Sequence, residues 1–178
     1  LYTVRGKGTF VANRKSGFRY MNKIETFTDQ VVKSGMQPST KVLKNTIVLA
    51  DDAVAIGLGV PQGQGVLYLE RLRYANDRPL AIIESYLPLP QCAALANYDL
   101  GGSSLFGFLD QHLGMKVAHV HRVVSAILAD SEDQQMLKVP EHTPLLHFTN
   151  QSYTESGEIV EYCHSRFRVD MISFTADM

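Results

Sequence analysis

Two arginines that stand two positions apart are the residues best suited to bind a ligand. The segment LYLERLRYAND, residues 67–77, has the composition of a β-strand, so Leu69, Arg71 and Arg73 are predicted to share one face. Neighbouring guanidinium groups are costly on a sheet unless they are solvated or paired, and together they suit a phosphate or a carboxylate. The alternative is a pair of exposed arginines matched to acids on the partner strand, such as Glu84.

Two predicted helix starts offer further groups for an anion. Ser103 and Ser104 follow two glycines at the start of a predicted helix, where backbone N–H groups and hydroxyls suit a negative charge. Thr28 lies in the first turn of another predicted helix, residues 26–34. Ordinary N-capping is the alternative at both places. The sequence does not say whether the helix starts and the arginines meet in space.

The last long strand, within IVEYCHSRFRVDM at residues 159–171, is predicted to have two different faces. One face carries Glu161, Cys163, Ser165 and Phe167, and the other carries Tyr162, His164, Arg166 and Arg168. An acid and a hydroxyl on one face could bind the hydroxyls of a sugar. A strand with one polar face in water is the alternative.

Motifs of common enzymes and metal sites are absent from the sequence. There is no GxSxG, HExxH, P-loop or dinucleotide-binding fingerprint. His119 and His121 would share a strand face and could touch a metal, but no cysteine or acid cluster accompanies them, so a surface pair is favoured. We therefore expect no catalytic residue, no metal and no cofactor.

Cysteine spacing and hydropathy bear on location. Cys92 and Cys163 lie far apart without CxxC-type spacing, which favours reduced thiols. The sequence has no signal peptide at its start and no run of about 18 apolar residues. These features predict a cytoplasmic protein that does not enter a membrane.

Charge is distributed unevenly along the chain. Residues 1–23 hold six basic side chains and no acidic one, whereas residues 24–178 hold all 18 acidic groups and have a net charge of −7. The head of the chain would be attracted to a polyphosphate and the body would be repelled. A solvated basic tail is the alternative.

The predicted elements alternate between hairpins and short helices. Two short strands, residues 1–4 and 9–11, surround Arg5-Gly6-Lys7-Gly8. Helices are predicted at residues 26–34, 51–58, 103–113 and 131–137, with capping boxes at Thr26/Asp29 and Ser131/Gln134. Strands are predicted at residues 40–49, 66–74, 79–87, 117–128, 143–154 and 158–169, with an edge strand at 172–175. This order predicts an antiparallel α+β fold and not a βαβ series.

Several stretches together resemble one family of bacterial regulators. GKGTFV, residues 6–11, resembles the closing wing of the winged helix-turn-helix in GntR-type repressors. The remainder of the chain is similar to the effector-binding (UTRA) domain of the HutC branch of that family. The stretches that carry this similarity are ETFTDQVVKSGMQPSTKVL (25–43), LERLRYANDRPLAIIESYLP (69–88), GGSSLFGFLDQHLG (101–114) and IVEYCHSRFRVDMISF (159–174).

The resemblance implies a division of the chain into three segments. Residues 1–12 would be the C-terminal remnant of the winged helix-turn-helix domain, 13–23 a basic linker and 24–178 the UTRA domain. The recognition helix would lie upstream of Leu1, and Arg5 and Lys7 would lie near DNA. The implied fold is a chorismate-lyase-like antiparallel sheet with flanking helices, in a homodimer with a small-molecule pocket in each effector domain.

The resemblance also implies roles for individual residues. In sugar-phosphate sensors of this family, the positions that match Thr28, Arg71, Arg73 and Ser104 hold phosphate, and those that match Glu161 and Phe167 face the ligand. Together with neighbouring polar groups, the expected effector-binding set is Thr28, Arg71, Arg73, Glu84, Ser103, Ser104, Glu161, Ser165 and Phe167. The effector would be a small anion: a sugar phosphate, a phosphonate or a carboxylate.

One position departs from the family pattern. Many relatives carry an acid three residues before the aromatic of the YLP segment, where this chain has Ile83 followed by Glu84. A slip of one residue on a strand reverses the face, so either Glu84 points away from the pocket or a bulge restores it. The departure gives weight to a phosphonate effector. A lyase-type enzyme on the same fold, with the arginines binding a carboxylate substrate, remains the alternative function.

Overall fold

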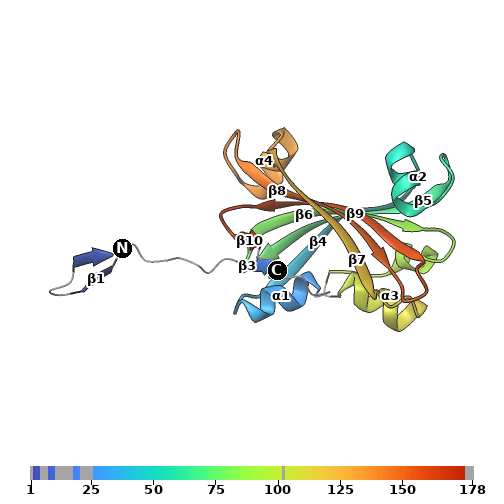
Figure 1. Cartoon of the computed structure of the whole chain (residues 1–178), viewed down its shortest axis with the longest axis horizontal. Coiled ribbons are helices and arrows are strands. Elements are labelled where there is room, and N and C mark those ends of the chain that lie inside the picture. Colours follow the sequence, from blue (N-terminus) through green and yellow to red (C-terminus); the bar gives the residue numbers. More distant parts are fainter. Residues whose placement is uncertain (1, 5–7, 11–17, 21–25, 102, 175–178) are drawn as a thin grey trace.

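The computed structural model describes residues 2–4, 8–10, 18–20, 26–101 and 103–174. Its centre is a six-stranded antiparallel sheet in the order β4-β5-β6-β9-β8-β7 (Figure 1). The strands are β4 (Pro38–Leu49), β5 (Gly65–Ala75), β6 (Arg78–Pro88), β7 (His119–Leu128), β8 (Pro144–Tyr153) and β9 (Ile159–Arg168). The predicted antiparallel α+β fold is confirmed.

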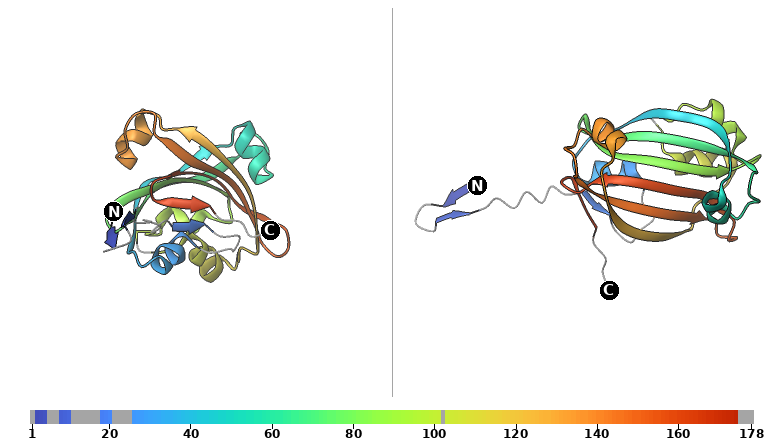
Figure 2. Two further views of the ribbon diagram at one scale, coloured as in Figure 1. Left: turned by 60° about the vertical axis from the view of Figure 1, so that its left-hand side comes forward. Right: turned by 90° about the horizontal axis from the view of Figure 1, so that it is seen from above.

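Helices cover both faces of this sheet (Figure 2). The inner face, towards which the sheet curves, is covered by α1 (Phe27–Lys33), α3 (Leu105–Leu113) and the 3-10 helix η1 (Ala93–Asn97). The outer face carries α2 (Asp52–Leu58) and α4 (Ser131–Leu137). The four α-helices were predicted from the sequence, and η1 was not.

Alternating residues of β5 supply the cores on the two faces. Leu67 and Leu69 are fully buried on the inner face with Leu105 of α3, whereas Leu72 packs on the outer face with Leu137 of α4. Because side chains alternate along a strand, Arg71 falls on the same face as Leu69. The sheet is therefore built with an apolar layer on each face.

Helix capping agrees with the sequence for α1 and differs for α4. Thr26 and Asp29 form the predicted capping box of α1. At α4 the box is made by Asp130 and Asp133, and not by the predicted Ser131 and Gln134. The Asp130 carboxylate accepts a hydrogen bond of 2.8 Å from the Asp133 N–H, so the cap lies one residue earlier than expected.

The ends of the chain form two small sheets outside the main one. β1 (Tyr2–Val4) and β2 (Gly8–Phe10) make the predicted antiparallel hairpin, while Arg5 and Lys7 lie outside the described residues. β3 (Phe18–Tyr20) pairs in parallel with β10 (Ile172–Phe174). Three residues of the expected linker, Phe18–Tyr20, thus pair with the C-terminal part of the chain, and β10 is not an edge strand of the main sheet. Pairing between such distant segments leaves no local sequence pattern.

Candidate functional site

Arg71 lies at the centre of a buried polar network on the inner face. Its guanidinium Nη2 donates a 2.9 Å hydrogen bond to Ser85 Oγ on β6, and Ser85 Oγ donates one of 2.6 Å to Glu161 Oε1 on β9. The direct distance between Arg71 Nη2 and Glu161 Oε1 is 4.0 Å. The two charges are thus joined through a serine hydroxyl that lies between three neighbouring strands.

The Glu161 carboxylate is held at both oxygens. Ser152 Oγ on β8 donates a 3.1 Å hydrogen bond to Glu161 Oε2. Buried charge must be paired or hydrogen-bonded, and Glu161 satisfies this with two hydroxyls and one arginine. Burial lowers the pKa of Arg71, and Glu161 acts against that shift. The network spans β5, β6, β9 and β8, so it fixes the centre of the inner face.

Arg73 connects the sheet to helix α1. Its Nη2 donates a 3.1 Å hydrogen bond to Thr28 Oγ1, and its guanidinium lies 4.2 Å from the centre of the Phe27 ring. Arg73 is 3% exposed, so both contacts form away from bulk water, where a cation–π contact is strongest. The structure therefore brings together Arg73 and the Thr28 hydroxyl, as the sequence hypothesis requires.

Ser104 caps α3, and Ser103 precedes it. Ser104 Oγ accepts the Gly107 N–H at 3.4 Å, and Ser103 Oγ lies 3.5 Å from the Tyr98 hydroxyl. These contacts fit the ordinary N-capping alternative. They place both hydroxyls at the start of α3, on the helix that covers the inner face.

Ser165 and Phe167 lie on the predicted inner face of β9. Both are buried, with exposed fractions of 2% and 1%. The Phe167 ring packs edge-on against Phe148, with ring centres 5.3 Å apart, and Ser165 pairs across the sheet with Ile83. Phe167 is thus a core residue in this structure.

Glu84 lies on the outer face, so the expectation that it joins the arginines is wrong. It accepts hydrogen bonds of 2.9 Å from the Tyr68 hydroxyl and 2.6 Å from Arg166 Nη1. A register shift between Arg73 and Tyr74 sets Glu84 opposite Glu70 on the outer face, and the pairing from Arg73 back to Val66 is regular, so nothing returns Glu84 to the inner face. The inner position belongs to Ile83, which is 8% exposed and packs in the apolar core.

The comparisons with known proteins agree with this arrangement. Residues 33–173 match the sequence model of the UTRA domain. The chain belongs to the UTRA domain family. One curated relative of this UTRA chain is the HTH-type transcriptional repressor NagR of Bacillus subtilis, which is 24% identical over 98% of this chain and 71% of that protein. Another is the probable transcriptional regulator PhnF of Escherichia coli, which is 29% identical over 97% of this chain and 71% of that protein.

Solved structures share the fold of this UTRA domain. The effector domain of PhnF from Mycobacterium smegmatis superposes with a TM-score of 0.83 at 22% identity, covering 90% of this chain and 98% of that one. The ligand-binding domain of a GntR-family regulator from Bordetella bronchiseptica superposes with a TM-score of 0.75 at 21% identity, covering 80% and 89%. The curated relatives of this UTRA chain are named as transcriptional regulators, and the solved structures show that it shares their fold.

Three residues of the UTRA inner face were not predicted from the sequence. Ser85 and Ser152 bind Glu161, and Arg122 on β7 lies at the far side of the sheet. Ser85 reaches this face through the register shift between Arg73 and Tyr74, because the two-residue Asn76-Asp77 turn with regular pairing would have set Glu84 there instead. The other two required the strand order β6-β9-β8-β7, which only the fold supplies.

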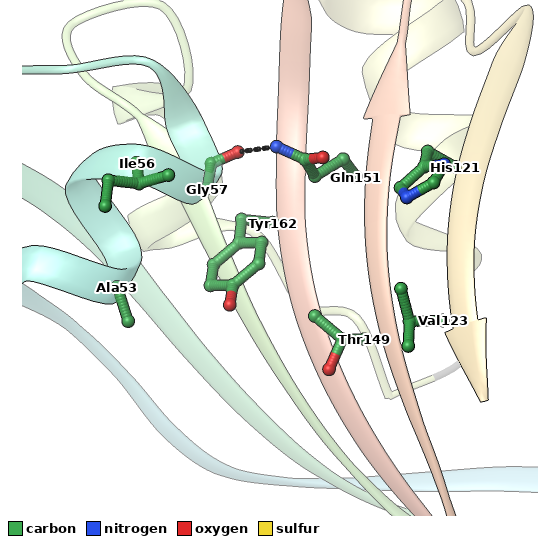
Figure 3. Close-up of a pocket in the computed structure, with 8 residues that line it drawn as sticks. All are labelled: Ala53, Ile56, Gly57, His121, Val123, Thr149, Gln151 and Tyr162. Carbon is green, nitrogen blue, oxygen red and sulfur yellow. Dashed lines mark hydrogen bonds between the residues drawn. The ribbon is translucent and has the colours of Figure 1, made fainter. Parts of the chain in front are cut away.

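The outer face of the UTRA domain has a hollow of its own (Figure 3). This groove has a volume of about 300 Å³ and lies between α2 and the strands β7, β8 and β9. The Gly57 carbonyl accepts a 3.0 Å hydrogen bond from Gln151, and a Cβ at Gly57 would clash with the Tyr162 ring beneath it. The lining residues are Ala53, Ile56, Gly57, His121, Val123, Thr149, Gln151 and Tyr162. None of these residues is an arginine or a lysine, so the groove is less suited to binding an anion than the inner face is.

Membrane and metal sites were also sought in the described part of the UTRA chain. None of the described helices has both the length and the apolar composition needed to cross a bilayer. Among the described residues, no three histidine, cysteine or acidic side chains gather in a way that could hold a metal ion.

Proposed function

We propose that this UTRA chain is the sensor part of a ligand-responsive transcriptional regulator, and that its inner face binds a small anionic metabolite: a sugar phosphate, a phosphonate or a carboxylate. The observation that carries the proposal is the placement of two buried arginines, Arg71 and Arg73, on one face of β5 beside the start of α1. Burying a guanidinium is expensive, so two of them together favour a site that receives negative charge.

The contacts of the two arginines support complementary roles. Arg73 is oriented by the Thr28 hydroxyl and the Phe27 ring, which are both neutral groups. Arg71 shares Glu161 through Ser85. An incoming phosphoryl or carboxylate group would gain charge-assisted hydrogen bonds from both guanidiniums. The hydroxyl of Ser165 on β9 and that of Ser103 before α3 would serve the polar remainder of the ligand, while Glu161 would hold Arg71 in place through Ser85.

Helix α1 offers a route from the ligand to DNA. Thr28 lies in the first turn of α1, so an anion that binds Arg73 would also pull on this helix. The segment before α1 would pass the change to a DNA-binding domain upstream, near Arg5 and Lys7. A ligand shifts such a balance only by its different affinity for the two arrangements. The regulator would act in the cytoplasm as a homodimer, and ligand binding would relieve repression.

A regulator is favoured over an enzyme. The curated relatives are named as transcriptional regulators and repressors. A lyase would need an acid near the arginines, yet Glu84 lies on the other face and Glu161 is already engaged by two serines. Turnover of a chorismate-like acid by the purified chain would reverse this preference.

The proposal can be tested by calorimetry with a panel of phosphorylated metabolites, phosphonates and carboxylates. Arg71→Ala and Arg73→Ala should each weaken binding of the best compound about tenfold or more, because each removes at least one charge-assisted hydrogen bond. Arg78→Ala is the matched control, since Arg78 is exposed at the start of β6 and pairs only loosely with Asp170 at 3.7 Å. Binding by both variants as tight as that of the wild type would refute the site.

The regulatory role has its own test. The protein together with its DNA-binding domain should bind its promoter region with an affinity that falls as salt rises, and the same metabolite should change that affinity. Absence of salt-dependent promoter binding would refute the regulator and leave the ligand site intact.

A further inference from the structure

We propose that a second copy of this chain pairs with β7, so that the two main sheets join edge to edge, antiparallel, about a twofold axis at Val124. This inference rests on the homodimer named in the proposed function and assigns the surface that forms it. The anion site of the inner face is not part of this surface.

The two edges of the main sheet are β4 and β7, and β4 carries features that prevent pairing with another strand (Figure 2). It begins with Pro38, contains Lys41 and Lys44, and shifts its register between Val42 and Lys44. Proline, lysine and a bulge are the features by which edge strands avoid edge-to-edge association. β4 is therefore a protected edge.

β7 has none of these features. Its ten residues, HVHRVVSAIL, include no proline and no lysine, and they pair with β8 from His119 to Leu128 without a register shift. In the described part of the chain, β8 is the only strand that pairs with β7, so the opposite side of β7 offers its backbone N–H and C=O groups to another strand. Such a long and regular edge is a template for pairing.

Apolar side chains are exposed along β7. Val123, Val124 and Leu128 are 54%, 38% and 63% exposed. Val123 also lines the groove on the outer face, where Ile56 of α2 is 79% exposed (Figure 3). Single exposed apolar residues are common on protein surfaces, but a group of them along one open strand indicates an interaction surface.

The distribution of charge along β7 suits pairing of the strand with its own copy. Arg122 is the only arginine or lysine among its ten residues, and its Nε donates a 2.8 Å hydrogen bond to Asn150 on β8. Residues that stand opposite each other in an antiparallel pair share a face, so a twofold pair is centred on one residue of each copy. Centring on Arg122 would oppose two guanidinium groups, which destabilises the pair.

Centring on Val124 sets no like charges opposite each other. This register brings Val120 opposite Leu128, which removes the most exposed apolar side chain of β7 from water. Arg122 comes to stand opposite the partner's Ala126, which is small and exposed and leaves room for the guanidinium. Moving the centre by one residue towards the N-terminus would leave Leu128 beyond the paired strands.

Pairing through β7 also limits the assembly to two chains. A twofold contact uses the same surface on both copies, and that surface is then covered. Since β4 is the other edge of the main sheet and is protected, the joined sheet offers no further unprotected edge. The expected product is a closed dimer and not a fibre.

The test is the mass of the full 178-residue chain in solution, measured by sedimentation equilibrium at micromolar concentration. The wild type should have about twice its chain mass of 19.8 kDa. Ala126→Lys and Ala126→Glu are a matched pair, because they place opposite charges at one exposed position that faces the partner's Arg122. The dissociation constant of the Ala126→Lys dimer should exceed that of the Ala126→Glu dimer about tenfold or more, since both symmetric contacts change.

The control is Ile47→Lys, which adds the same charge to β4 at a position that is 62% exposed. It should leave the dissociation constant of the dimer unchanged, and thermal unfolding checks that each variant is folded. A wild-type chain that stays monomeric, or equal dissociation constants for the two Ala126 variants, would overturn the inference. Dissociation by Ile47→Lys would overturn it as well, because the copy would then lie on β4.

Binding of methylphosphonate, measured on the same proteins, separates this inference from the proposed function. The Ala126 variants should bind it as the wild type does, because Ala126 lies far along the sheet from the strand that carries Arg71. If the dimer fails while methylphosphonate binding still depends on Arg71, the β7 surface is wrong and the anion site stands.

Discussion

The two faces of the sheet carry buried charge in different ways. On the outer face, acids meet basic partners directly: Arg166 lies 2.6 Å from Glu84 and 2.8 Å from Asp133, and Lys44 lies 2.8 Å from Glu70. On the inner face, the described parts of the strands carry four charged side chains that are buried or half-buried. These are Arg71, Arg73, Arg122 and Glu161. On the outer face each base is matched with an acid by a direct ion pair, whereas on the described inner face of the strands the arginines are oriented by hydroxyls, an amide, aromatic rings and one acid.

The difference also appears in what each network holds together. Arg166 connects β9 to α4 through Asp133, and burial raises the pKa of Asp133 while Arg166 acts against that shift. The inner network joins four strands to one another through the hydroxyls of Ser85 and Ser152. In the outer network, Arg166 is thus paired with acids of the protein itself. On the inner face of the strands, Glu161 is the one acid near the arginines among the described residues.

The largest expected effect comes from removing the shared acid of the inner face. Glu161→Ala leaves Arg71 buried without the carboxylate that it faces, and breaking such a pair costs about 3–5 kcal/mol. Urea unfolding should show this loss, and added phosphate should restore more stability in the variant than in the wild type. A loss below about 1 kcal/mol would mean that the Arg71–Glu161 pair contributes little to the inner face.

A smaller loss is expected on the outer face. Arg166→Ala removes the partner of Glu84 and Asp133, and we expect about 2 kcal/mol, discounted from the fully buried case because Arg166 and Glu84 are 18% and 21% exposed. Phosphate should not restore this variant beyond its effect on the wild type. Equal rescue of both variants by phosphate would show that the two faces do not differ in their response to anions.

The acid that relatives carry near the YLP segment offers a test in the opposite direction. Ile83 lies directly across from Arg71 on the inner face, so Ile83→Glu would bring a second carboxylate to the arginines. We expect methylphosphonate to bind this variant about tenfold or more weakly, because the new acid competes for the same guanidiniums. Val123→Glu, on the exposed part of β7, is the control and should bind as the wild type does.

The smallest effect concerns two stacked histidines on the outer face. The rings of His147 and His164 lie 5.5 Å apart, near Arg166 and Glu84. Burial lowers the pKa of both, with further contributions from Arg166 at His147 and from His147 at His164. Below about pH 6.5, these two histidines bind protons more readily in the unfolded chain than in the folded chain. The free energy of unfolding therefore falls as the pH falls.

The measurement is the urea midpoint at pH 7.5 and pH 5.5 for the wild type and His164→Gln. The variant should lose less stability than the wild type between these two values, because one of the resisting groups is gone. An equal loss in both proteins would assign the pH dependence to other groups.

The sequence predicted the faces of single strands well and the relations between strands poorly. Alternation placed Arg71 with Arg73 and Glu161 with Phe167, because a strand has a period of two whatever its neighbours are. The alternation did not decide which face of the sheet Glu84 occupies, because that depends on whether a bulge interrupts the pairing of the strands.

Other features depended on which strands lie side by side. Ser85 and Ser152 contact Glu161 only because β6 and β8 flank β9. The β3–β10 pair joins the two ends of the chain, and Arg122 lies on a strand that no local motif connects to Arg71. Such relations follow from tertiary packing, which local patterns do not encode.

The inner face, and not the outer face, is expected to receive the anion. One calorimetric experiment compares the binding of methylphosphonate by the wild type, Arg73→Gln and Arg166→Gln, which remove one arginine from each face. An anion site on the inner face predicts that Arg73→Gln weakens binding about tenfold or more and that Arg166→Gln leaves it unchanged. Loss of binding in Arg166→Gln with wild-type binding in Arg73→Gln would contradict it.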